Sequence, residues 1–263
     1  MVETQIRFED GLTYERHMGV WSRLAGSVFI DWLALPSGLK WIDVGCGNGA
    51  FTELIVEKCV PNEVRGIDPS EAQLDFARKR PAAHAAKFDL ADAMALPFPA
   101  NTFDVATMAL VIFFVPNPAR GVAEMTRVVR PGGMIAAYAW DILGGGFTLE
   151  PLRIELREMG FKPVDPPTVE ASRIETMRDL WIGAGLTGVE TREITVERTF
   201  KNFEELWEIT ISGSPSIRLT LAEMSPADVE LFKTRVCARL PADAAGRISY
   251  QSRANAVKGR VPA

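Results

Sequence analysis

The run Asp-Val-Gly-Cys-Gly-Asn-Gly at residues 43–49 constrains the fold of this chain more than any other feature. The apolar segment 41–44 predicts a strand that leads into the run, and helical spacing returns over residues 50–58. Glycines at such a turn let a ligand approach the backbone and leave the first helix amides free to bind an anion. No Gly-Lys pair is followed by serine or threonine, which excludes a P-loop. The run therefore predicts a ligand-binding turn between a strand and a helix.

Strand and helix signals alternate after this turn. Further strands are predicted over residues 64–68, 85–89, within 103–114 and over 134–138, with helices over 50–58, 70–80 and 117–130. Asn117 and Pro118 favour a helix start, because asparagine caps helices and proline is tolerated at the first helical position. Such alternation is typical of an α/β fold in which a parallel sheet is covered on both faces.

Residues 142–172 interrupt this alternation with three consecutive glycines, several prolines and one short predicted helix over 149–159, so we predict an insertion or lid there. Beyond it, the sequence predicts helices over 174–185, 203–212 and 225–240 and strands over 189–199 and 248–257. We expect a single domain over 1–263, divided into an N-terminal helical cap (1–38), a cofactor-binding core (39–141), the lid (142–172) and a C-terminal part of the core with helical additions (173–263).

Composition narrows the class of protein. With 263 residues and 47% hydrophobic content the chain has ample material for a core, and its net charge of −5 offers no global attraction to nucleic acid. Cys46, Cys59 and Cys237 are too few and too unevenly spaced for a disulfide framework or a zinc site. The longest apolar run, 105–115, is too short to span a membrane, and no signal peptide is visible. We expect a cytoplasmic protein without a metal, a membrane or a nucleic-acid partner.

Two cofactors fit the glycine turn. Gly45, Gly47 and Ala50 satisfy the dinucleotide template G-x-G-x-x-G/A, with Asp68 about 20 residues beyond, which leaves a nicotinamide-dependent oxidoreductase open. However, Asp43 at the strand end would repel a pyrophosphate held by the same loop. S-adenosylmethionine has no phosphate and carries a cationic sulfonium, so it avoids this conflict. The alternative for Asp43 is a structural cap of the turn.

Four more motifs accompany the glycine run in the order and spacing of a known family. They are Gly-Ile-Asp-Pro-Ser at 66–70, Asp-Ala-Met-Ala-Leu-Pro-Phe at 92–98, Phe-Asp-Val at 103–105 and Arg-Val-Val-Arg-Pro-Gly-Gly at 127–133. Over residues 40–140 the chain resembles the class I S-adenosylmethionine-dependent methyltransferases, of the small-molecule group that includes the ubiquinone/menaquinone enzymes. The resemblance implies a Rossmann-like, seven-stranded, mostly parallel sheet with one reversed strand and helices on both faces.

The resemblance also implies roles for individual residues. Asp68 would accept both ribose hydroxyls, Asp92 would accept the adenine amino group, and the backbone of Met108 and Ala109 would lie beneath the cofactor. The alternatives are a helix cap for Asp68 and a surface loop residue for Asp92. The predicted cofactor-binding set is Asp43, Gly45, Cys46, Gly47, Asp68, Pro69, Asp92, Ala93, Met108, Ala109, Tyr14, Trp21 and Arg23.

The N-terminal members of that set, Tyr14, Trp21 and Arg23, are predicted to form a lid over the cofactor. An aromatic face attracts a sulfonium, and Arg23 could pair with the methionine carboxylate. The alternative is an amphipathic helix packed on the sheet.

The chain departs from the family after the fourth strand, where many relatives carry a histidine and this sequence has Phe113 and Phe114. His84 is expected to be an incidental surface residue. The candidates for a catalytic proton acceptor are therefore His17, Tyr14 and Asp141, although alignment with an activated methyl group could supply much of the rate by itself.

We expect a methyltransferase, monomeric or homodimeric, that acts on a small-molecule acceptor. A non-catalytic S-adenosylmethionine-binding protein is the other alternative. Residues 142–172 and the helix at 203–212 are predicted to cover the acceptor, with Gly144–Gly146 as a hinge and Phe147, Leu149 and Leu152 as apolar surface. Ligands in open α/β sheets bind at the carboxyl ends of the strands, which is where Asp141 precedes this segment.

Overall fold

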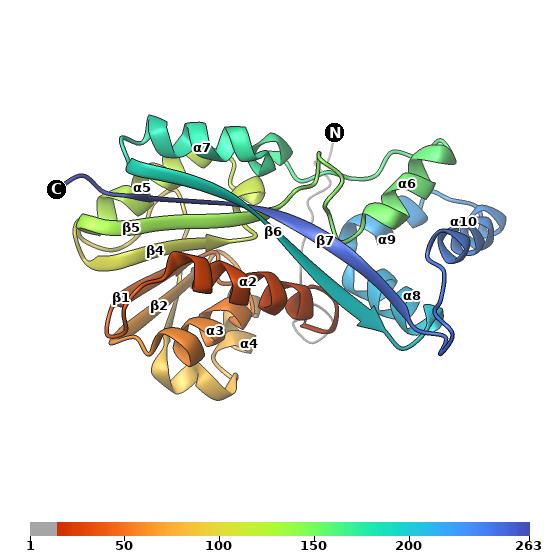
Figure 1. Cartoon of the computed structure of the whole chain (residues 1–263), viewed down its shortest axis with the longest axis horizontal. Helices are drawn as coiled ribbons and strands as arrows, with labels where there is room; N and C mark the ends of the chain where they lie inside the picture. Colours follow the sequence, from red (N-terminus) through yellow and green to blue (C-terminus); the bar gives the residue numbers. More distant parts are fainter. Residues whose placement is uncertain (1–14) are drawn as a thin grey trace.

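A single seven-stranded sheet organises the computed structural model, which describes residues 15–263 (Figure 1). Its strand order is β3-β2-β1-β4-β5-β7-β6. Strands β1 to β5 pair in parallel, whereas β7 runs antiparallel to both of its neighbours, so the predicted mostly parallel sheet with one reversed strand is confirmed. The strands are β1 (Lys40–Val44), β2 (Glu63–Asp68), β3 (Lys87–Leu90), β4 (Phe103–Ala109), β5 (Val129–Trp140), β6 (Thr187–Phe200) and β7 (Ile248–Arg260).

Helices cover both faces of the sheet, as predicted. In Figure 1 α5 and α7 lie on one side, and α2, α3 and α4 lie on the other. The α-helices are α2 (Val20–Leu33), α3 (Ala50–Cys59), α4 (Glu71–Ala77), α5 (Pro118–Val128), α6 (Glu150–Glu158), α7 (Ile174–Gly183), α8 (Phe203–Gly213), α9 (Pro215–Leu221) and α10 (Pro226–Arg239). The shorter turns are η1 (Glu15–Gly19), η2 (Pro81–Ala85), η3 (Ile112–Phe114) and η4 (Val169–Ser172). None of the helices within residues 15–263 is both long enough and apolar enough to span a membrane.

Several helices begin where a side chain satisfies a free backbone amide. Ser70, Asn117 and Ser225 each accept a hydrogen bond from the amide three residues later, and proline follows Asn117 and Ser225 at the first helical position. The predicted end of α5 was two residues too late. Val129 leaves the helix to pair with Phe103, so β5 starts well before the predicted strand at 134–138.

Strands β6 and β7 form an arm that extends beyond the rest of the sheet (Figure 1). Trp140, at the carboxyl end of β5, pairs with Ala254, and residues 248–252 of β7 pair with β6 alone. Helices α8, α9 and α10 lie between the two strands in sequence, so the arm carries them past the carboxyl edge of the parallel strands. This arrangement places the helical additions at the edge where α/β proteins bind ligands.

Candidate functional site

The glycine turn has a backbone that only glycine adopts easily. Gly45, Gly47 and Gly49 have φ angles of 76°, 52° and 81°, in the left-handed region. The amides of Gly45 and Cys46 both donate to the carbonyl of Ile67, each at 2.8 Å, which fixes the turn against the end of β2. A Cβ atom added at Gly47 would meet no heavy atom within 4 Å, so the backbone there faces open space that a ligand can enter.

Asp68 links the glycine turn to the start of α4. Its carboxylate accepts hydrogen bonds from the amides of Gly47 and Ser70, each at 2.9 Å. Burial raises the pKa of Asp68, while these two hydrogen bonds act in the opposite direction. The alternative role as the helix cap belongs to Ser70, whose hydroxyl accepts from Gln73. Asp68 therefore orders the turn and keeps further acceptor capacity for a ligand.

Asp43 is a buried carboxyl group without a full set of partners. Its Oδ2 atom accepts from the Thr52 hydroxyl at 2.6 Å, while Oδ1 is buried with no hydrogen-bond partner among the described residues. Burial, aided by the nearby charge of Asp68, raises the pKa of Asp43 to about 7, against the opposing hydrogen bond from Thr52. A cationic ligand would stabilise the ionised form, so this site fits a phosphate-free, positively charged cofactor.

The other predicted cofactor residues follow the neighbouring strands. Asp92 is exposed beyond β3 and accepts from the Met94 amide at 2.7 Å, and Ala93 lies between them. Met108 and Ala109 end β4, next to β1 in the sheet. The structure thus brings residues that follow or end four adjacent strands, β3, β2, β1 and β4, to one edge. Cys46 and Pro69 lie in the two turns at this edge, and burial keeps the Cys46 thiol protonated by raising its pKa.

The predicted lid residues have partners within the protein. Arg23 pairs with Glu53 at 3.3 Å and Glu57 at 2.7 Å on α3. Trp21 is fully buried, with its ring centroid 6.3 Å from that of Trp140 and 5.3 Å from that of Tyr250. These contacts match the alternative of an amphipathic helix packed on the rest of the molecule. Tyr14 lies outside the described residues.

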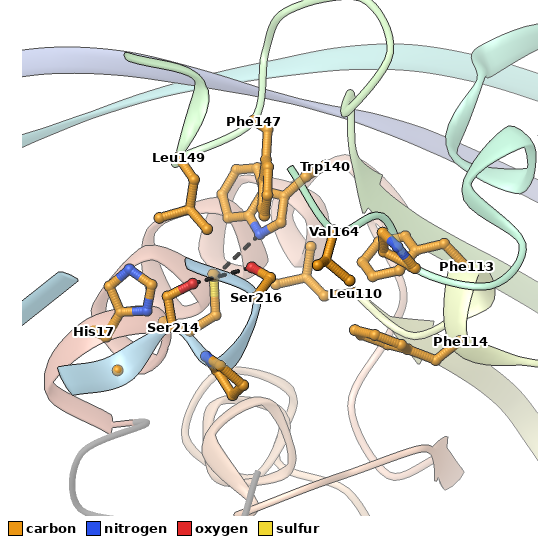
Figure 2. A pocket seen from close by; sticks show the side chains of 14 residues that line it. His17, Leu110, Phe113, Phe114, Trp140, Phe147, Leu149, Val164, Ser214 and Ser216 are labelled. Carbon is orange, nitrogen blue, oxygen red and sulfur yellow. Dashed lines mark hydrogen bonds between the residues drawn. The ribbon is translucent and has the colours of Figure 1, made fainter. Parts of the chain in front are cut away.

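The carboxyl ends of β1, β2, β3 and β4, with the turns that follow them, form the predicted cofactor edge. An apolar pocket lies beside it (Figure 2). Its residues border about 530 Å³ of non-protein space, a figure that includes open solvent. Leu110, which follows β4 directly, is part of its wall, so the pocket and the cofactor edge share one strand end. The lining residues are His17, Met18, Leu110, Phe113, Phe114, Trp140, Phe147, Leu149, Val164, Pro166, Gly213, Ser214, Pro215 and Ser216.

His17 enters this pocket from the π-helical turn η1. It is 3% exposed, and its Nδ1 atom is buried without a hydrogen-bond partner in the part of the chain that the structure describes. Burial, supported by the positive charge of Arg198, lowers the pKa of His17 to about 4, while the nearby Gly213 backbone acts in the opposite direction. His17 is therefore neutral near pH 7 and able to accept a proton.

Arg198 on β6 holds the turn that carries His17. Its guanidinium donates to the carbonyls of His17 and Arg16, at 2.7 and 2.8 Å, and lies 4.3 Å above the ring of Phe200. A Cβ atom at Gly213 would collide with the His17 side chain, so glycine permits the close approach of α8. Short π-helical turns are frequent at functional sites.

Asp141 has a structural partner and is not among the pocket-lining residues. Its carboxylate accepts from Arg253 at 2.5 and 3.1 Å and from the Gly144 amide at 3.0 Å. Added Cβ atoms at Gly144 and Gly146 would collide with Asp141 and Arg253, respectively, so these glycines form a packed turn rather than a free hinge. His84 is exposed and its Nδ1 atom is 2.9 Å from the carbonyl of Pro81.

The lid prediction located part of the pocket and missed the rest. Phe147 and Leu149 line it, whereas Leu152 is buried in α6 and does not. Only Gly213 of α8 lines it, together with the residues that follow that helix. Ser214, Ser216 and Arg198 were missed, because an isolated serine or arginine gives no local signal. Among residues 15–263, no group of three or more histidine, cysteine or acidic side chains could hold a metal.

Comparisons with known proteins agree with this geometry. Residues 42–137 match the family described as "Methyltransferase domain". The ubiquinone/menaquinone biosynthesis C-methyltransferase UbiE of Roseobacter denitrificans is 38% identical over 125 residues, 46% of this chain and 50% of the relative. A demethylmenaquinone methyltransferase of Staphylococcus aureus is 36% identical over 132 residues, 49% and 52% of the two chains. The chain thus spans about half the length of the curated relatives it matches.

Solved structures show the same fold over most of the chain. The YcgJ protein of Bacillus subtilis has a TM-score of 0.59 at 17% identity and covers 91% of this chain and 98% of its own. Phosphoethanolamine N-methyltransferase 2 of Haemonchus contortus, solved with S-adenosylmethionine, has a TM-score of 0.59 at 15% identity. The match covers 96% of this chain and 56% of that one. At such identities the likeness concerns the fold alone.

Residues 42–137 are thus a methyltransferase domain, and the sheet order agrees with the resemblance to the class I S-adenosylmethionine-dependent methyltransferases. The five motifs at residues 43–133 lie within this domain, so the resemblance that they indicated is confirmed for this part of the chain. Within that class, the similarity is to the small-molecule group that includes the ubiquinone and menaquinone enzymes, and nothing found supports the oxidoreductase alternative.

Proposed function

We propose that this protein binds S-adenosylmethionine across the ends of β1, β2, β3 and β4 and transfers its methyl group to a small molecule in the pocket of Figure 2. One observation carries the proposal. The predicted cofactor edge ends at Ala109, and the next residue, Leu110, already lines the pocket. A methyl donor and an acceptor bound in these two places would be neighbours, and alignment of this kind supplies much of the rate of such reactions.

The residues at the cofactor edge fit this cofactor. The open space at Gly47 would admit the methionine part against the backbone, and Asp68 would accept the ribose hydroxyls while it continues to hold the turn. Asp92 would accept from the adenine amino group and Ala93 would donate its amide. The unpartnered oxygen of Asp43 offers negative charge where the bound cofactor is positive. When bound, the cofactor supplies a methyl group activated by its sulfonium.

On the acceptor side, residues 142–172 and the segment after α8 would cover the bound molecule. His17 is the group best placed to take a proton, because it is neutral, buried and part of the pocket wall. Asp141 is a weaker candidate, since Arg253 already occupies its carboxylate. We include no nucleic-acid partner, consistent with the net charge of −5, and expect a monomer or a homodimer.

Two measurements test this function. Isothermal titration of the full chain with S-adenosylmethionine and with its demethylated product should show binding, and the absence of binding at about 1 mM contradicts the proposal. Transfer of labelled methyl groups to low-molecular-weight compounds of a cell extract then separates an enzyme from a non-catalytic binding protein. A fluorescence titration with NADH, expected to show no binding, tests the oxidoreductase alternative directly.

A further inference from the structure

The wall of the pocket is hard for solvent to reach. Trp140, Leu149 and Ser214 line it and are only 1%, 2% and 2% exposed. A molecule larger than water therefore reaches these side chains only when part of the wall moves. Figure 2 shows two sides of this wall, with Phe147 and Leu149 of the lid on one side and Ser214 and Ser216, where α8 gives way to α9, on the other.

Helix α6 is tied to the lid side of the wall. Its N-cap residue, Leu149, lines the pocket. Arg153, one turn further along, is buried, and its guanidinium donates to the carbonyl of Val164 at 3.5 Å and pairs with Asp165 at 2.5 Å. Val164 lines the pocket as well. A displacement of α6 would therefore carry two wall residues with it.

Helix α10 is tied in the same way to the opposite side of the wall. The ring of Phe232 on α10 lies against that of Trp207 on α8, with centroids 5.5 Å apart. Lys233 on α10 pairs with Glu204 on α8 at 2.9 Å. The residue that follows α8 is Ser214, which caps α9. Helices α8 to α10, called the arm helices below, thus form one unit that includes this side of the wall.

Four charged side chains join α6 to α10, and the two helices lie together at the end of the molecule away from β1 and β2 (Figure 1). Arg235 contacts Glu155 and Glu158, each at 2.5 Å, and Arg239 contacts the same two carboxylates at 2.5 and 2.9 Å. Burial would raise the pKa of Glu155, but hydrogen bonds from both arginines hold it below its ordinary value, so this carboxyl is ionised near pH 7. These four residues are called the α6–α10 clamp below.

The clamp suits a contact that opens and closes. The side chains of Arg235, Arg239 and Glu158 are 37%, 33% and 47% exposed, so water can solvate these charges as the helices separate. An ion pair in contact with water contributes little to stability, and salt screens it. The clamp therefore holds the two sides of the wall together without making their separation costly.

We propose that the α6–α10 clamp is the gate of the pocket, where the lid and the arm helices separate to admit the acceptor and to release the methylated product. The inference rests on the proposed function, which makes the pocket the acceptor site, and adds how that site is reached. The clamp lies outside the matched domain at residues 42–137, in a part of the chain that the family match does not describe. Opening of a lid sets the turnover of many enzymes.

Thiol labelling of the full chain measures the opening without an acceptor. In a Cys237→Ser background, which removes the exposed cysteine, Leu149→Cys places a thiol on the buried wall. The rate of its reaction with N-ethylmaleimide, followed by mass spectrometry, is proportional to the open fraction of the molecules. Cys46 and Cys59 are buried and stay in place as reporters of unfolding of the whole molecule. Val164→Cys, a smaller change in volume on the same wall, is the second reporter if the Leu149→Cys protein does not fold.

Glu158→Gln weakens the clamp at its exposed end while Glu155 keeps both arginines. We expect the pocket thiol to react about two- to fivefold faster than in the parent protein. Salt at about 1 M, where the Debye length is about 3 Å, should also speed the reaction in the parent protein. Glu204→Gln is the matched control, because it removes an ion pair of α10 that stays within the arm helices, and it should leave the rate unchanged. Cys46 and Cys59 should react equally slowly in all of these proteins.

A pocket thiol that reacts at the same rate in the parent and in the Glu158→Gln protein overturns the inference. A rise that Cys46 and Cys59 share overturns it as well, because the clamp would then only stabilise the whole fold. The labelling rates do not depend on the proposed function, which fails separately if isothermal titration shows no binding of S-adenosylmethionine.

Discussion

The predicted cofactor edge and the apolar pocket are neighbours built by different means. The cofactor edge consists of short contiguous motifs in which backbone amides, glycine conformations and carboxylates make the contacts. The pocket takes its wall from six segments spread between residues 17 and 216, and most of that wall is apolar side chains. The first region can be recognised in a local stretch of sequence, whereas the second exists only once distant segments meet. Changes in the two regions should therefore affect cofactor binding and acceptor chemistry separately.

The largest difference between the effect on methyl transfer and the effect on cofactor binding is expected from His17→Asn. The variant keeps a polar side chain but cannot take up the proton, so methyl transfer should fall about 10²- to 10⁴-fold, the usual range for loss of a general base. The affinity for S-adenosylmethionine, measured by isothermal titration, should stay within about threefold.

His84→Asn is the matched control for that experiment, because His84 is exposed and distant from the pocket wall. It should leave the rate unchanged. A His17→Asn protein with the wild-type turnover would mean that His17 only packs against α8 and takes no proton.

Asp68→Ala should act in the opposite way, on the cofactor first. A charge-assisted hydrogen bond contributes about 1.5–3 kcal/mol, so the dissociation constant for S-adenosylmethionine should rise at least about tenfold. Asp75→Ala, on the exposed face of α4, serves as the control. An unchanged dissociation constant would place the cofactor elsewhere.

Arg198→Met should shift a pH profile by a smaller amount. The positive charge of Arg198 helps to lower the pKa of His17 to about 4, and only neutral His17 accepts a proton. In the wild type, activity is lost as the pH falls towards 4. Without Arg198 the pKa rises towards 6.5, so the acid limb moves to higher pH and the rate at pH 7 falls by less than about tenfold.

Arg198→Lys keeps the charge, so the acid limb of the pH profile should return towards its wild-type position. The rate should recover less, because lysine cannot bond both carbonyls of the η1 turn in the same way. An acid limb that stays in place in the methionine variant would show that Arg198 acts through packing alone.

The smallest expected effect is a proton released when the cofactor binds. The pKa of Asp43 is raised to about 7, so near pH 7 this carboxyl carries a proton in about half of the molecules. The positive cofactor should lower that pKa, so binding releases the proton from those molecules that carry it. Because the buffer takes up this proton, the heat of titration should depend on which buffer is used. The Asp43→Asn protein should lose this dependence, and a wild-type heat that is the same in all buffers would contradict the interpretation.

Much of the fold could be predicted because its signals are local. Alternating apolar segments and helix caps such as Asn117 gave the order of strands and helices, and the predicted β5 began too late because Val129 is held by pairing with Phe103 across the sheet. The roles suggested for Trp21, Arg23 and Asp141 depended on what each side chain contacts. The structure gave them Trp140, Glu53 and Arg253 as partners, none of which lies close to them in the sequence.

The sequence by itself determined the class of the domain at residues 42–137, because the glycine run at residues 43–49 dictates a backbone conformation and the motifs after it recur at fixed spacing along adjacent parallel strands. Only the tertiary structure decided which side chains line the pocket. The β6–β7 arm brings Ser214 and Ser216 across to His17, and Arg198 on that arm holds the turn from which His17 projects. Burial then makes this histidine neutral, and burial is a property of the packed molecule that no single residue carries in the sequence.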